Sequence, residues 1–304
     1  MATTAARPCH DAAVTTIGII GGGKAATLHA DAALQMRGVE LIGVGGRPGT
    51  ADRLAASAAV PDLALPALCE ANLVVIAVPP PEVTTVAELV AKQILGGAPV
   101  RAVMIEPPLR SLPQLSVPTV LAANLLHAPV VKQALRAIGS MHTPHHLQLR
   151  VRLPKPTWGA HGTPAFGGPL HDPGIRLASL LLAAASEAAV HVEQIEIEGG
   201  VHAAIELASG RRAGLDVAWL EGSSRIELEV ADDGGVILLT LDPLPRLEID
   251  GRQLEPPDLH PLDALGFVGQ LDRLRRTADG AEPWPSVATG LAIEALLDPQ
   301  SSAL

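Results

Sequence analysis

Aromatic residues are scarce in this sequence, since its 304 residues include two Phe, three Trp and no Tyr. The chain also lacks a dense Lys/Arg run and carries a formal net charge of −10. Aromatic stacking platforms and basic patches are what nucleic acids and anionic membrane surfaces require of a partner. We therefore expect neither nucleic acid nor membrane as a partner, and a small-molecule substrate instead.

Cysteine is nearly absent too. Cys9 and Cys69 are too few for a disulfide framework or a four-ligand zinc site. The first residues contain no apolar signal region, and the most apolar helical stretch, 177–192, is interrupted by Ser186 and Glu187. We expect a cytoplasmic protein with no membrane span and no metal.

The first third of the chain alternates strand and helix patterns. Continuous apolar runs predict strands at 15–20, 39–44, 73–78 and 101–105. Helical patterns follow the first strand up to Gln35 and recur at 50–59 and 82–95. This alternation predicts an α/β fold that begins with a Rossmann-type, doubly wound parallel sheet over residues 1–118, with a loose arm at 1–13.

The second part of the chain alternates with a period of two. This pattern predicts strands at 146–153, 190–198, 213–219, 225–230 and 236–241, and hence a large, mostly antiparallel open sheet. Helices are expected at 129–138, 170–185, 261–278 and 286–297. Residues 119–304 are thus expected to form an α/β domain for substrate binding and oligomerisation. Because an open sheet with one apolar face must be covered, we expect a homo-oligomer, a dimer or tetramer.

A glycine-rich turn joins the first strand to the first helix: Gly21, Gly22, Gly23, Lys24, Ala25, Ala26. Gly21 permits a tight turn, Gly23 lets backbone N–H groups approach a pyrophosphate, and Ala26 permits close helix packing. The helix N-terminus favours the anion. The turn therefore predicts a dinucleotide site.

The residues at the end of the second strand indicate which dinucleotide the site prefers. Domains that prefer NAD place an acid there to hold the ribose hydroxyls, whereas this chain has Gly46 and Arg47. Arg47 can pair with a 2′-phosphate, so NADP is favoured, with NAD as the alternative. A solvated turn arginine is the structural alternative.

Several ordered motifs resemble the glucose-fructose oxidoreductase, inositol dehydrogenase and MocA (Gfo/Idh/MocA) family. They are the turn at 21–26, the strand and proline turn 74–80, the segment 105–109, the stretch 167–176 and the closing helix after 284–286. The resemblance implies NAD or NADP in the first domain and sugars, cyclitols or related carbonyl compounds as substrates. If the chain is a reductase, we expect the nicotinamide beside 79–81, with Val78, Pro79, Pro80 and Glu106 as candidate cofactor-binding residues.

Three positions depart from the family pattern, and one of them is Val83, which stands where the family has a histidine in the helix after the proline turn. The lysine that contacts substrate is replaced by Pro107, and the histidine that handles the proton is replaced by Arg176. An arginine cannot act as a base, because its pKa exceeds about 12. Asp172 lies four residues before Arg176, so on a helix the two share a face and the guanidinium keeps the carboxylate ionised. Asp172 is then a candidate base.

Arg176 is a candidate for binding a substrate anion or stabilising an oxyanion. The alternative is a surface ion pair between Asp172 and Arg176, and for Glu106 a carboxylate that accepts backbone N–H bonds. His161, His171 and Lys155 are further candidates for proton transfer, with simple solvent exposure as their alternative.

Three functions remain open. The first is an NADPH-dependent reductase of a small carbonyl or imine compound. The second is a non-redox enzyme on the same scaffold, which catalyses proton transfer, elimination or cyclisation. The third is an inactive dinucleotide-binding or regulatory protein, since a fold does not fix a function.

Overall fold

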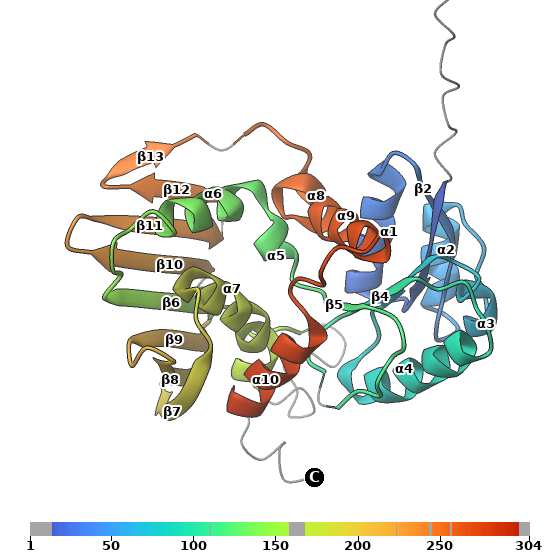
Figure 1. Ribbon diagram of the computed structural model, residues 1–304, viewed down its shortest axis with the longest axis horizontal. Helices are drawn as coiled ribbons and strands as arrows, with labels where there is room; N and C mark the ends of the chain where they lie inside the picture. The colour runs from blue at the N-terminus through green and yellow to red at the C-terminus, as the bar shows by residue number, and fades with distance from the viewer. Residues whose placement is uncertain are drawn as a thin grey trace, which may run out of the picture.

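The computed structural model describes residues 14–109, 111–157, 168–222, 224–242, 245–255 and 257–297. This part of the chain contains two sheets, each with helices packed against it (Figure 1). The predicted fold class is confirmed: a doubly wound parallel sheet is followed by a larger, mostly antiparallel one. No helix in the described ranges is long and apolar enough to cross a membrane.

The first sheet has the strand order β2-β1-β3-β4-β5, and its neighbouring strands are parallel. Its strands are β1 (Thr15–Ile20), β2 (Val39–Gly45), β3 (Leu73–Ile76), β4 (Ala102–Ile105) and β5 (Thr119–Leu121). Every residue of β3 and β4 is buried, because helices cover both faces of the sheet. β5 belongs to this sheet although it follows residue 118.

A single bridge extends the first sheet beyond β2. Asp62 pairs with Val44 in parallel orientation, and the N–H of Leu63 donates to the Val44 carbonyl at 2.8 Å. With this bridge counted as a strand, the order is that of dinucleotide-binding domains, in which the connections reverse direction between β1 and β3. Ligands of such sheets bind at the carboxyl ends of the strands at this reversal, which is where the turn after β1 lies.

The helices around the first sheet include two from late in the sequence. They are α1 (Lys24–Gln35), α2 (Ala51–Ala58), α3 (Leu65–Leu68), α4 (Pro80–Leu95), α8 (Pro261–Ala264) and α9 (Phe267–Ala278). Leu271 and Leu274 of α9 share a core with the alanines of α1 on one face of the sheet, while Val83 and Val90 of α4 pack on the other. The predicted helix 261–278 is broken at Gly266, whose φ is 82°.

The second sheet has the order β13-β12-β11-β10-β6-β9-β8-β7, and only β6 and β9 pair in parallel among its described neighbours. Its strands are β6 (His146–Leu153), β7 (Ala189–Ile197), β8 (Gly200–Leu207), β9 (Arg212–Trp219), β10 (Arg225–Asp232), β11 (Gly235–Asp242), β12 (Arg246–Ile249) and β13 (Arg252–Leu254). The sequence pattern did not predict β5, β8, β12 or β13.

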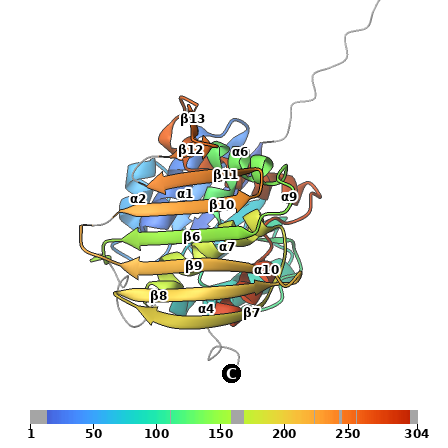
Figure 2. The same ribbon diagram turned by 90° about the vertical axis from the view of Figure 1, so that its left-hand side faces the viewer.

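The two faces of the second sheet differ. Leu149 and Leu215 point into a core with the helices on one side. These helices are α5 (Asn124–His127), α6 (Pro129–Ile138), η2 (Leu170–Gly174), α7 (Ile175–Ala185) and α10 (Val287–Leu297). The opposite face, toward the viewer in Figure 2, carries ion pairs of Arg150 with Glu227 and Glu229. The apolar face, which we expected a second copy to cover, is covered by the chain's own helices.

Candidate functional site

The turn after β1 requires glycine at its first position. Gly21 has a φ of 145°, and a Cβ there would lie 2.2 Å from the carbonyl oxygen of Ala77, which follows β3. The same Cβ would lie 3.3 Å from the Cβ of Ala26, a fully buried residue of α1. The close approach of strand, turn and helix thus depends on two small residues.

Gly22 and Gly23 have different surroundings. A Cβ on Gly22 would lie 2.6 Å from the backbone nitrogen of Ala51, whereas one on Gly23 would meet nothing within 4 Å. Gly23 is the N-cap of α1, followed by Lys24 and Ala25. The first N–H groups of a helix have no partner inside the helix and favour an anion. A pyrophosphate fits the open space beside Gly23 for this reason.

Gly46 and Arg47 follow β2 on one side of the turn. Gly46 packs against Gly21, since a Cβ on it would lie 3.4 Å from the Gly21 carbonyl carbon. The exposed Arg47 forms an ion pair with Glu82 in the first turn of α4. Glu82 is not among the site residues predicted from the sequence.

Val78, Pro79 and Pro80 connect β3 to α4 on the other side of the turn. The N–H of the preceding Ala77 donates to the Ile20 carbonyl at 2.8 Å, so this connection starts beside the glycine turn. The structure therefore brings the predicted cofactor residues of three neighbouring strands to one edge of the first sheet.

Glu106 follows β4 and is only 6% exposed. One of its carboxylate oxygens lies 2.6 Å from Nε2 of His29 on α1. The other accepts a hydrogen bond from a guanidinium nitrogen of Arg176 at 2.5 Å, and a second nitrogen of Arg176 donates to the Pro107 carbonyl oxygen at 2.8 Å. Because Arg176 lies in α7, this cluster joins the first sheet to the helices of the second.

The charges around Glu106 fix its ionisation. Burial alone raises the pKa of a carboxyl group, but the Arg176 guanidinium and the His29 ring outweigh it and lower the pKa of Glu106 to about 2. Glu106 is therefore ionised throughout the neutral range, with both oxygens engaged. This state suits a carboxylate that holds an arginine and excludes one that donates a proton.

The described partners of Arg176 differ from the predicted one. Because Asp172 and Arg176 are four residues apart, we expected them on one face of one helix. In the structure Asp172 lies in η2, a π-helical turn that contains Pro173, whereas Arg176 lies in α7. The side chain of Asp172 is outside the described residues. Likewise, the described partners of Glu106 are side chains and not the backbone N–H groups that were the sequence-based alternative.

The remaining candidates are spread over several segments. His171 lies in η2 and is partly exposed. Lys155 is exposed after β6, and its Nζ lies 5.6 Å from the ring centre of Trp219 at the end of β9, in a cation–π contact. His161 falls within 158–167, outside the described residues.

His29 is a residue of this cluster that the sequence analysis missed. It is fully buried, its ring meets Phe267 edge to face with centroids 5.8 Å apart, and its Nδ1 lies 3.5 Å from Nε2 of Gln270. The signal was available, because His29 is a polar residue at helical spacing in an otherwise alanine-lined stripe with Ala26 and Ala33.

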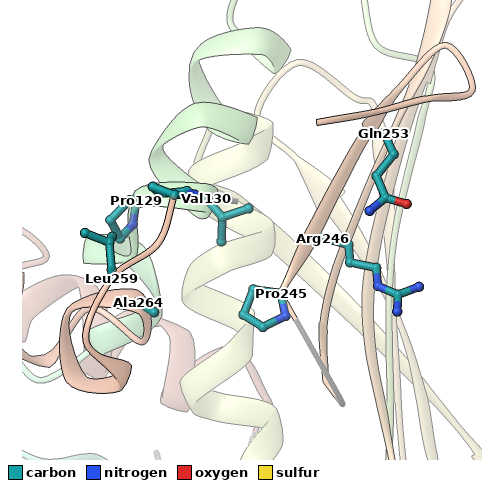
Figure 3. A pocket seen from close by; sticks show the side chains of 8 residues that line it. Pro129, Val130, Pro245, Arg246, Gln253, Leu259 and Ala264 are labelled. Atoms are coloured by element: carbon teal, nitrogen blue, oxygen red, sulfur yellow. The ribbon is translucent and has the colours of Figure 1, made fainter. Parts of the chain in front are cut away.

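No group of three or more His, Cys, Asp or Glu side chains within the described ranges could hold a metal ion. A cavity of about 260 Å³ lies between α6, α8 and the β12–β13 hairpin (Figure 3). Its lining is mainly apolar, as with Pro129, Val130 and Leu259, and includes none of the predicted site residues.

Solved structures share this fold over nearly the whole chain. GenD2 from gentamicin A biosynthesis, solved in complex with NAD, is 18% identical with a TM-score of 0.76, over 99% of this chain and 97% of that one. A protein of Sinorhizobium meliloti assigned as a myo-inositol dehydrogenase is 19% identical with a TM-score of 0.76, over 95% and 97%. UDP-N-acetylglucosamine 3-dehydrogenase GnnA from Acidithiobacillus ferrooxidans is 18% identical with a TM-score of 0.74, over 95% and 97%.

These likenesses establish the two-domain fold that the sequence motifs implied. No protein-family model matches the sequence, and no curated protein matches it either.

Proposed function

We propose that this chain is an NADP-linked oxidoreductase, a divergent member of the Gfo/Idh/MocA family that reduces a small carbonyl or imine compound. The observation that carries the proposal is the glycine turn at the reversal of the first sheet, where Gly23 opens to free space at the start of α1. The fold shared with GenD2, which was solved with NAD, supports a nicotinamide dinucleotide.

The residues at the edge of the first sheet then have distinct tasks. Arg47 binds the 2′-phosphate, and the connection Val78-Pro79-Pro80 flanks the nicotinamide. The bound cofactor supplies a hydride. Arg176, fixed by Glu106 and Pro107, keeps 35% of its side chain exposed and stabilises the negative charge that develops on the substrate oxygen or nitrogen.

The proton must come from another group, because an arginine does not release one near neutral pH. Our candidates are His171, His161 and Lys155, with Asp172 as the base of the reverse reaction. Each is tested by its neutral variant, which should lower kcat while the Kd for NADPH stays unchanged.

A non-redox enzyme on the same scaffold is the second candidate. The mutual neutralisation of Glu106 and Arg176, with Pro107 at the lysine position, favours it. Asp172 with a histidine would then perform proton transfer, elimination or cyclisation. Turnover without any consumption of nicotinamide separates this reading from the first. An inactive regulatory protein is the outcome if the chain binds dinucleotide and turns over nothing.

Thermal unfolding with NADPH or NADH tests the cofactor site. A ligand at about one hundred times its Kd adds about 2.7 kcal/mol to the unfolding free energy, so the Tm should rise. Gly23→Ala should fold normally and lose this shift, because its methyl fills the open space. Gly139→Ala, at a helical φ of −63°, is the matched control and should keep it. No shift of the wild type with either cofactor at millimolar concentration would sink the proposal.

We also propose a homo-oligomer, a dimer or tetramer, in which the charged outer face of the second sheet is the contact surface. Opposite charges in rows across this face, such as Arg150 and Glu227, make it complementary to a second copy. Light scattering that shows a monomer at micromolar concentration would contradict this. A cytoplasmic location stays a prediction.

A further inference from the structure

We infer that Glu82 sets the dinucleotide preference of this chain by competing with the 2′-phosphate of NADP for Arg47. The inference rests on the proposed dinucleotide site and adds a residue of α4 to it. It also changes the expected selectivity, since Arg47 alone favours NADP, whereas the Arg47–Glu82 pair admits NAD as well.

Arg47 and Glu82 come from opposite sides of the glycine turn. Arg47 follows β2 and Glu82 lies in the first turn of α4, after β3, and these two strands are the neighbours of β1 in the sheet. Gly46 packs against Gly21 from one side, and Ala77 approaches it from the other. The ion pair therefore spans the carboxyl end of β1, where this fold binds its dinucleotide.

Both partners can be reached by a ligand, because the Arg47 side chain is 69% exposed and that of Glu82 is 31% exposed. A guanidinium binds a phosphate through two parallel N–H groups, and the Glu82 carboxylate already accepts a hydrogen bond from one guanidinium nitrogen, Nη2 of Arg47. A 2′-phosphate must displace this carboxylate and then remain close to a like charge. Glu82 thus weakens the binding of the NADP 2′-phosphate to Arg47.

The 2′-hydroxyl of NAD meets the opposite situation. It can donate a hydrogen bond to a carboxylate, as it does to the acid that NAD-preferring domains carry after the second strand. That position holds Gly46 and Arg47 here, and Glu82 supplies a carboxylate from α4 instead. The Arg47–Glu82 ion pair can therefore remain intact when NAD binds.

Glu82 also has a purely structural role open to it, because an acid in the first turn stabilises a helix through its dipole. Loss of that role would lower the stability of the protein and leave the ratio of the two Kd values unchanged. The ratio is therefore the quantity to measure.

The experiment titrates the full-length protein with NADPH and with NADH and follows the nicotinamide fluorescence. Glu82→Gln should shift the Kd ratio toward NADPH by about tenfold, and Arg47→Gln should shift it toward NADH by about tenfold, both less at high salt. Asp279→Asn is the matched control: it removes an exposed ion pair with Arg101, 2.8 Å long, and should leave the ratio unchanged.

A ratio within twofold of the wild type in Glu82→Gln, with both cofactors still bound, overturns the inference and leaves the proposed function standing. An equal shift in Asp279→Asn overturns it too, because the effect would then be one of net charge. A wild type that binds neither dinucleotide overturns the proposed function itself.

Discussion

Glu106 and Glu227 are both nearly buried carboxylates paired with arginine, but the regions around them are built differently. Glu106 lies at the junction of the two domains, between the fully buried His29 and Arg176. Glu227, 4% exposed, lies on the outer face of the second sheet under Arg150 and Arg225, whose side chains are 37% and 60% exposed. Packed helices and strands enclose Glu106, whereas only long side chains cover Glu227.

The two regions are therefore suited to different functions. A charge enclosed by the fold keeps its partners in one arrangement, so the junction can hold Arg176 in place for a substrate. A charge covered by exposed arginines can exchange its partners for water or for another molecule. The outer face is therefore suited to contact, and the junction to precise positioning.

Glu106→Ala should have the largest effect. It leaves Arg176 and His29 without their shared partner, and loss of one member of a buried pair costs about 3–5 kcal/mol of unfolding free energy. Urea unfolding followed by circular dichroism measures this loss. A loss of unfolding free energy below about 1 kcal/mol would show that the Glu106 ion pair is worth no more than a surface ion pair. The difference between the Glu106 and Glu227 regions would then not hold.

The second prediction concerns His127 on α5, another buried titratable group of the junction, whose ring lies 5.4 Å from that of Trp284. Burial, aided by Lys132 and Arg273, lowers its pKa to about 3. The unfolded histidine binds a proton below about pH 6.5 and the folded one does not, so stability should fall by on the order of 1 kcal/mol per pH unit between about pH 6 and 4.

Unfolding free energies across that range measure the slope. His127→Phe should reduce it, because the variant has no ring to protonate in the unfolded state. Substitution of the exposed His191 by Gln is the control. An unchanged slope in His127→Phe would assign the acid sensitivity to other groups.

At protein concentrations low enough to dissociate the proposed oligomer, Glu227→Gln should cost about 1–2 kcal/mol, less than the loss at Glu106, because Arg150 can turn fully to Glu229 and Arg225 to water. The same urea experiment measures it. Equal losses at Glu106 and Glu227 would show that the outer face is as closed as the junction, as it would be if a second copy covered it.

Glu229→Gln should have the smallest effect, about 0.5 kcal/mol, as for an exposed pair. A hydrogen bond from Arg150 lowers the pKa of Glu229, so its contribution is present above about pH 4.5 and is lost as the pH falls. High salt should weaken it by screening and leave the Glu106→Ala loss unchanged. The reverse salt dependence would contradict the conclusion that the fold encloses Glu106 and leaves the outer face of the second sheet open to solvent.

The sequence predicted the first sheet well because its signals are local. The run at β3 and the turn at Gly21 each depend on neighbouring residues and on a fixed spacing. β8 was missed because only a short hairpin turn at Gly199 separates it from β7. The alternating patterns of the two strands therefore follow each other closely in the sequence. β12 and β13 have only four and three residues, too few to show an alternation, and β13 is the edge strand of the sheet.

The site was predicted in part for the same reason. Spacing could place Asp172 and Arg176 on one helix, but it could not show that Arg176 reaches Glu106, seventy residues earlier in the sequence. His29 and Glu82 were missed because their partners come from other strands. Contacts across a sheet edge depend on topology, which a local pattern does not encode.

The late helix α9 has a consequence for how the protein is made. A ribosome releases the strands of the first sheet well before residues 267–278, so the alanine face of α1 has no cover until most of the chain has been synthesised. A fragment that ends at residue 118 would expose that face permanently. An isolated dinucleotide-binding domain of this chain would therefore need to keep β5 and to have α8 and α9 joined to it by a linker.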